Sequence, residues 1–140
     1  MVNVRSKSSL GGESTLGKGM IERNAGTMRY LGSVAGRETF DLSSENCGTK
    51  FAVHAITESM RKEVSGKNVR MIVISPGMVD TDLVSHTSDP KIVDDYNGWR
   101  KAMHGGLSAE AVADCLSYAY NQPQGVCVRE IVVAKTGQAD

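Results

Sequence analysis

The 140-residue sequence has no excess of charge of either sign and no long apolar run. Lysine and arginine together number 16, and aspartate and glutamate also number 16. This balance gives no basic field that would attract nucleic acid or an anionic membrane surface. No apolar run reaches the ~18 residues that a membrane-spanning helix needs. We therefore expect neither nucleic acid nor a membrane as a partner.

Cysteine is also scarce, because the sequence has only three. Their spacing fits no zinc motif. Cys115 and Cys127 lie in apolar contexts, where we expect them to be small buried residues. For Cys47, a small residue at a helix start is favoured over a reactive thiol. Free thiols without a signal peptide favour a cytoplasmic protein.

The three histidines are far apart in the sequence and show no metal-ligand spacing. They are His54, His86 and His104. We interpret His54 as a residue on the face of a helix and the other two as residues of a long loop. The histidines form no nucleophile–base pattern with Ser33 or Lys50. The sequence therefore predicts neither a metal site nor a hydrolase.

Strands and helices are expected to alternate along the chain. Met71 to Ile74 are continuously apolar, which is typical of a parallel strand covered on both faces. In chain order we expect a strand at 27–31, a helix at 46–64, a strand at 69–75, a helix capped by Ser108 and a strand at 126–134. This order implies right-handed crossovers and a parallel sheet. The predicted class is a three-layer α/β fold, with a short, mainly parallel sheet and flanking helices.

The helix at 46–64 has the strongest pattern. Apolar residues recur at every fourth position and are expected to form its buried face: Ala52, Ile56, Met60 and Val64. On the exposed face, Glu58 precedes Lys62 by four positions, a spacing that favours an ion pair. Gly66 follows at a position that is typical of a helix C-cap.

Two segments carry weaker signals. Residues 1–19 are rich in serine and glycine, which lowers helix propensity, and we expect a poorly ordered or degraded helix there. Residues 82–106 are expected to be a long loop, a kind of segment that is usually functional or mobile.

A serine turn and a lysine-bearing helix follow the first expected strand. The turn is Gly32–Gly36 (GSVAG), and Ser33 lies thirteen positions before Asn46 and seventeen before Lys50. Residues at the carboxyl ends of neighbouring parallel strands meet at one edge of a sheet. The sequence therefore places the serine and the lysine over one crevice.

Two further motifs complete the pattern, Ser75–Thr81 (SPGMVDT) and Glu130–Val133 (EIVV). Together with the spacing of the serine and the lysine, they resemble the short-chain dehydrogenase/reductase family. The resemblance runs from about Met20 to Gln138 and is strongest to the NADP-dependent branch that acts on hydroxy amino acids and other small alcohols. It implies that residues 20–140 are the C-terminal part of a Rossmann-like domain.

The resemblance also implies roles for individual residues. In the family, a tyrosine is the acid/base, a lysine lowers its pKa and holds the nicotinamide ribose, and a serine binds the substrate carbonyl. Ser33 and Lys50 match the serine and the lysine. Asn46 stands at the tyrosine position, and an amide does not exchange protons near neutral pH. General acid–base catalysis is worth ~10²–10⁴-fold, so we expect the chain alone to show little or no activity.

The cofactor implied by the resemblance is NADP or NAD. Lys50 and the segment at 76–81 would contact its nicotinamide end, with Pro76, Gly77, Val79 and Thr81 in that segment. The family's glycine-rich phosphate turn has no counterpart in the sequence, because the glycines near the start do not have its spacing. Cofactor binding by this chain alone is therefore expected to be weakened.

Other interpretations remain open. Ser33 can be a simple turn serine, Lys50 a solvated lysine, and Asp80 or Thr81 a helix N-cap. The chain can be an oxidoreductase that acts on a small alcohol or carbonyl substrate. It can also be a non-catalytic module that forms a homo-oligomer through the 46–64 helix or the exposed sheet edge, or a decayed fragment without a selected role.

Overall fold

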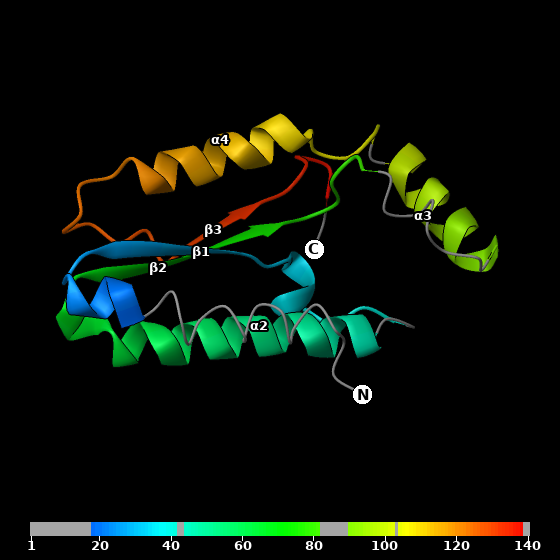
Figure 1. Ribbon diagram of the computed structural model, residues 1–140. Helices are drawn as coiled ribbons and strands as arrows, with labels where there is room; N and C mark the ends of the chain where they lie inside the picture. The colour runs from blue at the N-terminus through cyan, green and yellow to red at the C-terminus, as the bar shows by residue number, and fades with distance from the viewer. Residues whose placement is uncertain (1–17, 42–43, 82–89, 103, 139–140) are drawn as a thin grey trace.

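The computed structural model describes residues 18–41, 44–81, 90–102 and 104–138. It has three layers, with a helix on each face of a central sheet (Figure 1). The elements in chain order are β1 (Gly26–Leu31), η1 (Val34–Gly36), α2 (Ser44–Glu63), η2 (Ser65–Lys67), β2 (Val69–Pro76), α3 (Pro90–Ala102), α4 (Ala109–Tyr120) and β3 (Glu130–Val133). The predicted α/β class and the alternation of strands and helices are confirmed.

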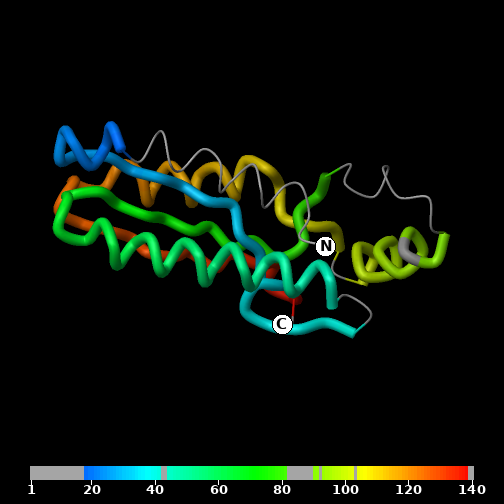
Figure 2. The backbone as a smooth tube through the Cα atoms, turned by 60° about the horizontal axis from the view of Figure 1, so that its bottom comes forward, coloured from blue at the N-terminus to red at the C-terminus, as the bar shows by residue number. Residues whose placement is uncertain are grey.

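The sheet has three parallel strands in the order β1-β2-β3. Figure 2 shows the strands running side by side, with β2 between its two neighbours. Every residue of β2 is buried, and Ile72 and Ile74 have no exposed surface. This burial explains why Met71 to Ile74 are continuously apolar, because helices cover both faces of the strand. β1 lies at an edge of the described sheet.

Helix α4 covers one face of the sheet. Its N-cap Ser108 accepts a hydrogen bond from the Ala111 amide at 3.1 Å, which confirms the predicted cap. Ile72 and Ile74 form the core under this helix with Ala119, and further apolar side chains surround them: Val112, Cys115, Leu116, Val128, Ile131 and Val133.

Helix α2 covers the other face, but not with the stripe that the sequence predicts. The four apolar residues of that stripe are only half-buried, whereas Cys47 and Thr57 are buried. A repeat of exactly four residues advances by about 40° at each step around a helix, so the stripe winds away from the sheet. The residues of α2 that face the sheet are spaced alternately three and four positions apart, and they include His54 between Cys47 and Thr57.

The exposed face of α2 carries the expected acidic–basic pair in a slightly different form. Arg61 donates two hydrogen bonds to Glu58, each at 2.7 Å, and Lys62 lies 3.8 Å from the same carboxylate. The hydrogen bond from Arg61 lowers the pKa of Glu58 to about 2. The carboxylate therefore stays charged throughout the neutral and mildly acidic range.

The end of α2 corrects the prediction for Gly66. The helix ends at Glu63, and Gly66 lies inside the short helix η2. The left-handed residue is Asn68, with φ of 49°, and asparagine tolerates this conformation better than most residues. Its side-chain amide also donates to the Asn24 carbonyl at 3.1 Å, which ties this turn to the start of β1.

Two predictions in the second half of the chain were wrong in extent. Part of the long loop expected at 82–106 is a helix, α3, which begins at Pro90, a residue that favours the first turn of a helix. The final strand is Glu130–Val133 rather than 126–134, and Cys127 is exposed rather than buried. Residues 1–17 and His86 lie outside the described residues, so the predictions for them are not tested. In the described ranges, no helix has the length and apolarity to cross a membrane.

Arg70 is a buried cation that shapes the region before β3. Only 6% of its surface is exposed. Its guanidinium donates to Thr27 Oγ1 at 2.9 Å, to the Tyr120 carbonyl at 3.0 Å and to the Gln122 carbonyl at 2.7 Å. Carbonyls at the end of a helix carry the negative end of its dipole. The Val126 carbonyl lies 3.4 Å from the same group, so this segment contacts Arg70 at the point where the sequence predicts a strand.

We predict that Arg70→Met lowers the free energy of unfolding by about 3 kcal/mol, because it leaves carbonyls buried without a donor. Urea denaturation followed by circular dichroism measures the change. Lys67→Met is the matched control, since Lys67 is an exposed cation three positions away, and its effect should stay within about 0.5 kcal/mol. Equal effects of the two substitutions would contradict this account of Arg70.

Candidate functional site

Ser33 lies at the carboxyl end of β1, where the chain leaves the sheet. The Gly32 amide still donates to the Ile74 carbonyl of β2 at 2.7 Å. Ser33 then caps the short helix η1, and its Oγ accepts a hydrogen bond from the Ala35 amide at 3.2 Å. This bond uses an acceptor lone pair, so the hydroxyl proton can still be donated to another group. Ser33 can therefore cap the turn and also donate its hydroxyl proton to a substrate carbonyl, which is the role that the resemblance implies.

The structure brings the serine turn directly against the lysine helix. A Cβ atom placed on Gly36 would lie only 2.9 Å from the backbone oxygen of Lys50, which is closer than real side chains pack. The two backbones therefore meet because position 36 is glycine. The Lys50 side chain is half-buried, and the Asn46 side chain, one turn earlier, is exposed. The predicted serine and lysine positions thus lie on two segments in direct contact.

The segment 76–81 is held between two other parts of the chain. The Gly77 amide donates to the Val133 carbonyl at 2.8 Å, which extends the sheet beyond β2. Gln138 then accepts from the Met78 amide at 3.0 Å. A Cβ atom at position 77 would meet the terminal amide of Gln138, which would have to move aside.

On its other side, this segment pairs with the chain before α4. Val79 forms a parallel bridge with Leu107, through hydrogen bonds of 2.8 Å from the Leu107 amide to the Met78 carbonyl and from the Asp80 amide to the Leu107 carbonyl. These bonds leave the carbonyl of Val79 on the opposite edge. Thr81 is exposed at the end of the segment.

Helix α3 contacts the site from beyond the carboxyl end of the sheet (Figure 1). The Tyr96 hydroxyl donates to the Val79 carbonyl at 3.2 Å, and Arg100 pairs with Asp80 at 2.6 Å. The ring centroid of Trp99 lies 6.4 Å from that of Phe40, a residue in the loop after η1. Sequence reasoning missed these contacts because it treated the whole segment as a loop.

His54 lies on helix α2, as predicted, and its ring contacts groups on the sheet, which the sequence did not indicate. Its Nε2 lies 3.3 Å from Ser75 Oγ, and its Nδ1 lies 3.5 Å from Glu130 Oε1. The available signal was the pair of glycines at 32 and 36, since a Cβ on either one would collide with the His54 ring. In the part of the chain that the structure describes, no group of side chains is arranged to hold a metal ion.

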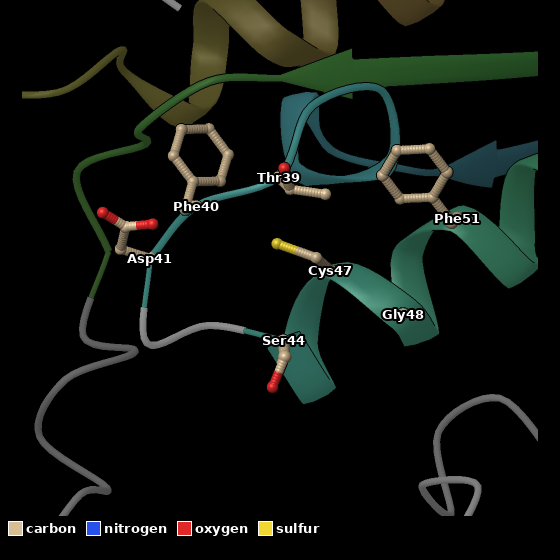
Figure 3. A pocket seen from close by; sticks show the side chains of 7 residues that line it. All are labelled: Thr39, Phe40, Asp41, Ser44, Cys47, Gly48 and Phe51. Atoms are coloured by element: carbon tan, nitrogen blue, oxygen red, sulfur yellow. The ribbon is translucent and has the colours of Figure 1, made fainter.

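A cleft of about 530 Å³ lies beside the first turns of α2. Its lining residues are Thr39, Phe40, Asp41, Ser44, Cys47, Gly48 and Phe51. Figure 3 shows the Cys47 sulfur pointing into the space between the loop and the helix. Cys47 is 2% exposed, in keeping with a small residue at a helix start. The lining includes none of Ser33, Asn46 and Lys50, so the cleft is separate from the predicted catalytic positions.

Comparisons with known proteins show which family the chain resembles. The family model "short chain dehydrogenase" matches residues 1–91. An uncharacterized oxidoreductase of Staphylococcus saprophyticus is 35% identical over 141 residues, which cover 99% of this chain and 56% of that protein. A second relative, the glycine betaine reductase ATRR of Emericella nidulans, is 30% identical over 94% of this chain and 10% of its own length. The chain spans about half the length of the first of these relatives.

Solved structures share the fold. A closed form of serine dehydrogenase complexed with NADP⁺ superposes with a TM-score of 0.75 at 24% identity, over 88% of this chain and 49% of its own. A 4-hydroxyisoleucine dehydrogenase complexed with NADH has a TM-score of 0.74 at 20% identity, over 99% of this chain and 57% of its own. At these identities the likeness concerns the fold, and it confirms the Rossmann-like arrangement of strands and helices.

We predict opposite effects for alanine at two glycines of this region. Gly36→Ala should lower the free energy of unfolding by about 1–3 kcal/mol, because the added methyl group meets the Lys50 backbone, which cannot move aside as a side chain can. Gly48→Ala is the control, since no atom lies within 4 Å of a Cβ at this helical position. It should stabilise the protein by up to about 1 kcal/mol through helix propensity. Thermal unfolding of both variants tests the contact, and a neutral Gly36→Ala would contradict it.

Proposed function

Because the chain belongs to the short-chain dehydrogenase family, we propose that it is an oxidoreductase unit that binds NADP or NAD at the carboxyl edge of its sheet. The substrate class is a small alcohol or carbonyl compound. The observation that carries the proposal is the close contact between the Ser33 turn and Lys50, with the segment 76–81 at the end of the neighbouring strand. Asn46 leaves this site without its usual proton donor.

The residues present fit the nicotinamide end of such a cofactor. The Lys50 ammonium is a donor for ribose hydroxyl groups. The Val79 carbonyl already accepts a hydrogen bond from the Tyr96 hydroxyl, which supports its use as an acceptor for a carboxamide donor. Ser33 would hold the substrate oxygen through its hydroxyl proton. The cofactor, when bound, supplies or accepts the hydride.

Asn46 limits the chemistry rather than the binding. Its amide can donate a hydrogen bond to a substrate oxygen, but it does not deliver a proton near neutral pH. Loss of general acid catalysis costs ~10²–10⁴-fold in rate. We therefore propose a unit that retains positions for the cofactor and the substrate but turns over slowly.

We predict that the purified chain binds NADPH or NADH saturably in a fluorescence titration, and that Lys50→Met weakens this binding. With cofactor bound, Asn46→Tyr should raise the rate of carbonyl reduction by ~10²–10⁴-fold over a panel of small carbonyl compounds. Asn121→Tyr, at the C-cap of α4, is the control for a tyrosine placed elsewhere. No binding of either cofactor at millimolar concentration would overturn the proposal.

A second candidate function is supported by exposed apolar side chains. Phe51 on α2 is 41% exposed, and Leu31 on the edge strand β1 is 61% exposed. Aromatic side chains such as Phe51 are enriched at protein–protein contacts. We propose, as the alternative, an interaction module that forms a homo-oligomer through α2 or through the edge of β1.

For this alternative, sedimentation velocity should show a concentration-dependent oligomer of the chain. Phe51→Ser should weaken the association if α2 forms the contact, because the aromatic ring would no longer be buried in it. Tyr118→Ser is the control, since Tyr118 is an exposed aromatic residue on α4, at 60% exposure against 41% for Phe51. A monomer over the whole concentration range would rule out the module.

A further inference from the structure

A polar network links three elements beneath the Ser33 turn. It consists of Glu130 on β3, Ser75 on β2, His54 on α2 and Arg37 directly after η1. Glu130 Oε1 accepts from Ser75 Oγ at 2.8 Å, and Glu130 Oε2 pairs with the Arg37 guanidinium. The His54 ring lies against both partners, 3.3 Å from Ser75 Oγ and 3.5 Å from Glu130 Oε1.

The network reaches from the interior to the surface, where the Arg37 side chain is 50% exposed. Ser75 has no exposed surface, and the side chains of His54 and Glu130 are 16% and 26% exposed. Burying such groups is costly unless they are hydrogen-bonded, and here each one has a partner. Polar contacts are directional, so the network fixes how β3, β2 and α2 are oriented around it.

Residues of the network lie against both ends of the serine turn. A Cβ atom on Gly32 would lie 2.6 Å from His54 Nε2, and one on Gly36 would lie 2.5 Å from His54 Cδ2. Arg37 is the C-cap residue of η1. The turn that carries Ser33 is therefore preceded and followed by residues that touch the network.

Ser75, His54 and Glu130 do not form a nucleophilic triad. The Ser75 hydroxyl lies at short range from the carboxylate, whereas a nucleophile would donate to the histidine. A side chain without exposed surface also offers no access to a substrate. The arrangement therefore has a positioning role and no hydrolytic one.

We propose that His54, Ser75, Glu130 and Arg37 are positioning residues that hold the Ser33 turn against Lys50. The proposal rests on the proposed function for its catalytic meaning, since the positioned groups are the substrate and cofactor residues of that site. Without the Glu130 carboxylate, Arg37 and Ser75 lose their common partner. The turn then opens more often, while the α4 face of the sheet keeps its packing.

Hydrogen exchange read by mass spectrometry tests the network without any cofactor. In Glu130→Gln we expect the amides of residues 33–37 to exchange about tenfold faster, while those of α4 at 109–120 stay unchanged, because only the local opening is affected. Glu38→Gln is the matched control, an exposed glutamate next to Arg37. Unchanged exchange at 33–37 would overturn the proposal, and so would an equal increase in α4, which would indicate general destabilisation.

Two substitutions of Arg37 keep the test decisive if Glu130→Gln fails to fold. Arg37→Met should speed exchange at 33–37, and Arg37→Lys should restore most of the protection, since it keeps the charge opposite Glu130. Equal exchange in both variants would overturn the positioning role. In parallel, each variant is titrated with NADPH. If the unaltered chain does not bind NADPH, the proposed function fails, whereas the exchange data still decide the network.

Discussion

The close backbone contact between Gly36 and Lys50 is the constraint on which the candidate site depends. The turn after β1 lies so close to α2 that a Cβ atom added at position 36 would be 2.9 Å from the Lys50 carbonyl oxygen. A side chain at position 36 would push η1 away from α2 and would move Ser33 with it. The polar network beneath the turn acts on the same contact from the sheet side, through His54 and Arg37. The packing at Gly36 and the hydrogen bonds of the network therefore both act on the positions of Ser33 and Lys50.

Helix α3 connects the two sides of the site. Tyr96 and Arg100 bind the segment after β2, and Trp99 contacts Phe40 in the loop after η1. A carbonyl has two lone pairs, so a donor that binds Val79 shares this oxygen with the Tyr96 hydroxyl or replaces it. If such a donor replaces the Tyr96 hydroxyl, α3 would lose this contact with the 76–81 segment and would keep the Arg100 and Trp99 contacts.

The sequence predicted those parts of the fold that local patterns determine. The apolar run of β2, the Ser108 cap and the parallel β-α-β-α-β order each depend on neighbouring residues, and each is confirmed. The final strand is shorter than predicted, and the segment before it contacts Arg70, which lies more than fifty positions away in the sequence. The network around His54 joins positions 21 and 55 residues apart, and no local pattern indicates such a contact. The left-handed residue at Asn68 was missed because Gly66, two positions earlier, carries the stronger propensity.

Asn46 shows how the framework of a site and its chemistry can be separated. Its side chain is exposed, and its backbone carbonyl accepts a hydrogen bond from Thr49 Oγ1 at 2.8 Å within the first turns of α2. The contacts that place Ser33 and Lys50 run through Gly36, His54 and Glu130. None of these contacts involves the side chain at position 46. If position 46 is the proton-donor position, as the proposed function holds, a change of residue there would remove the donor without removing any of these contacts.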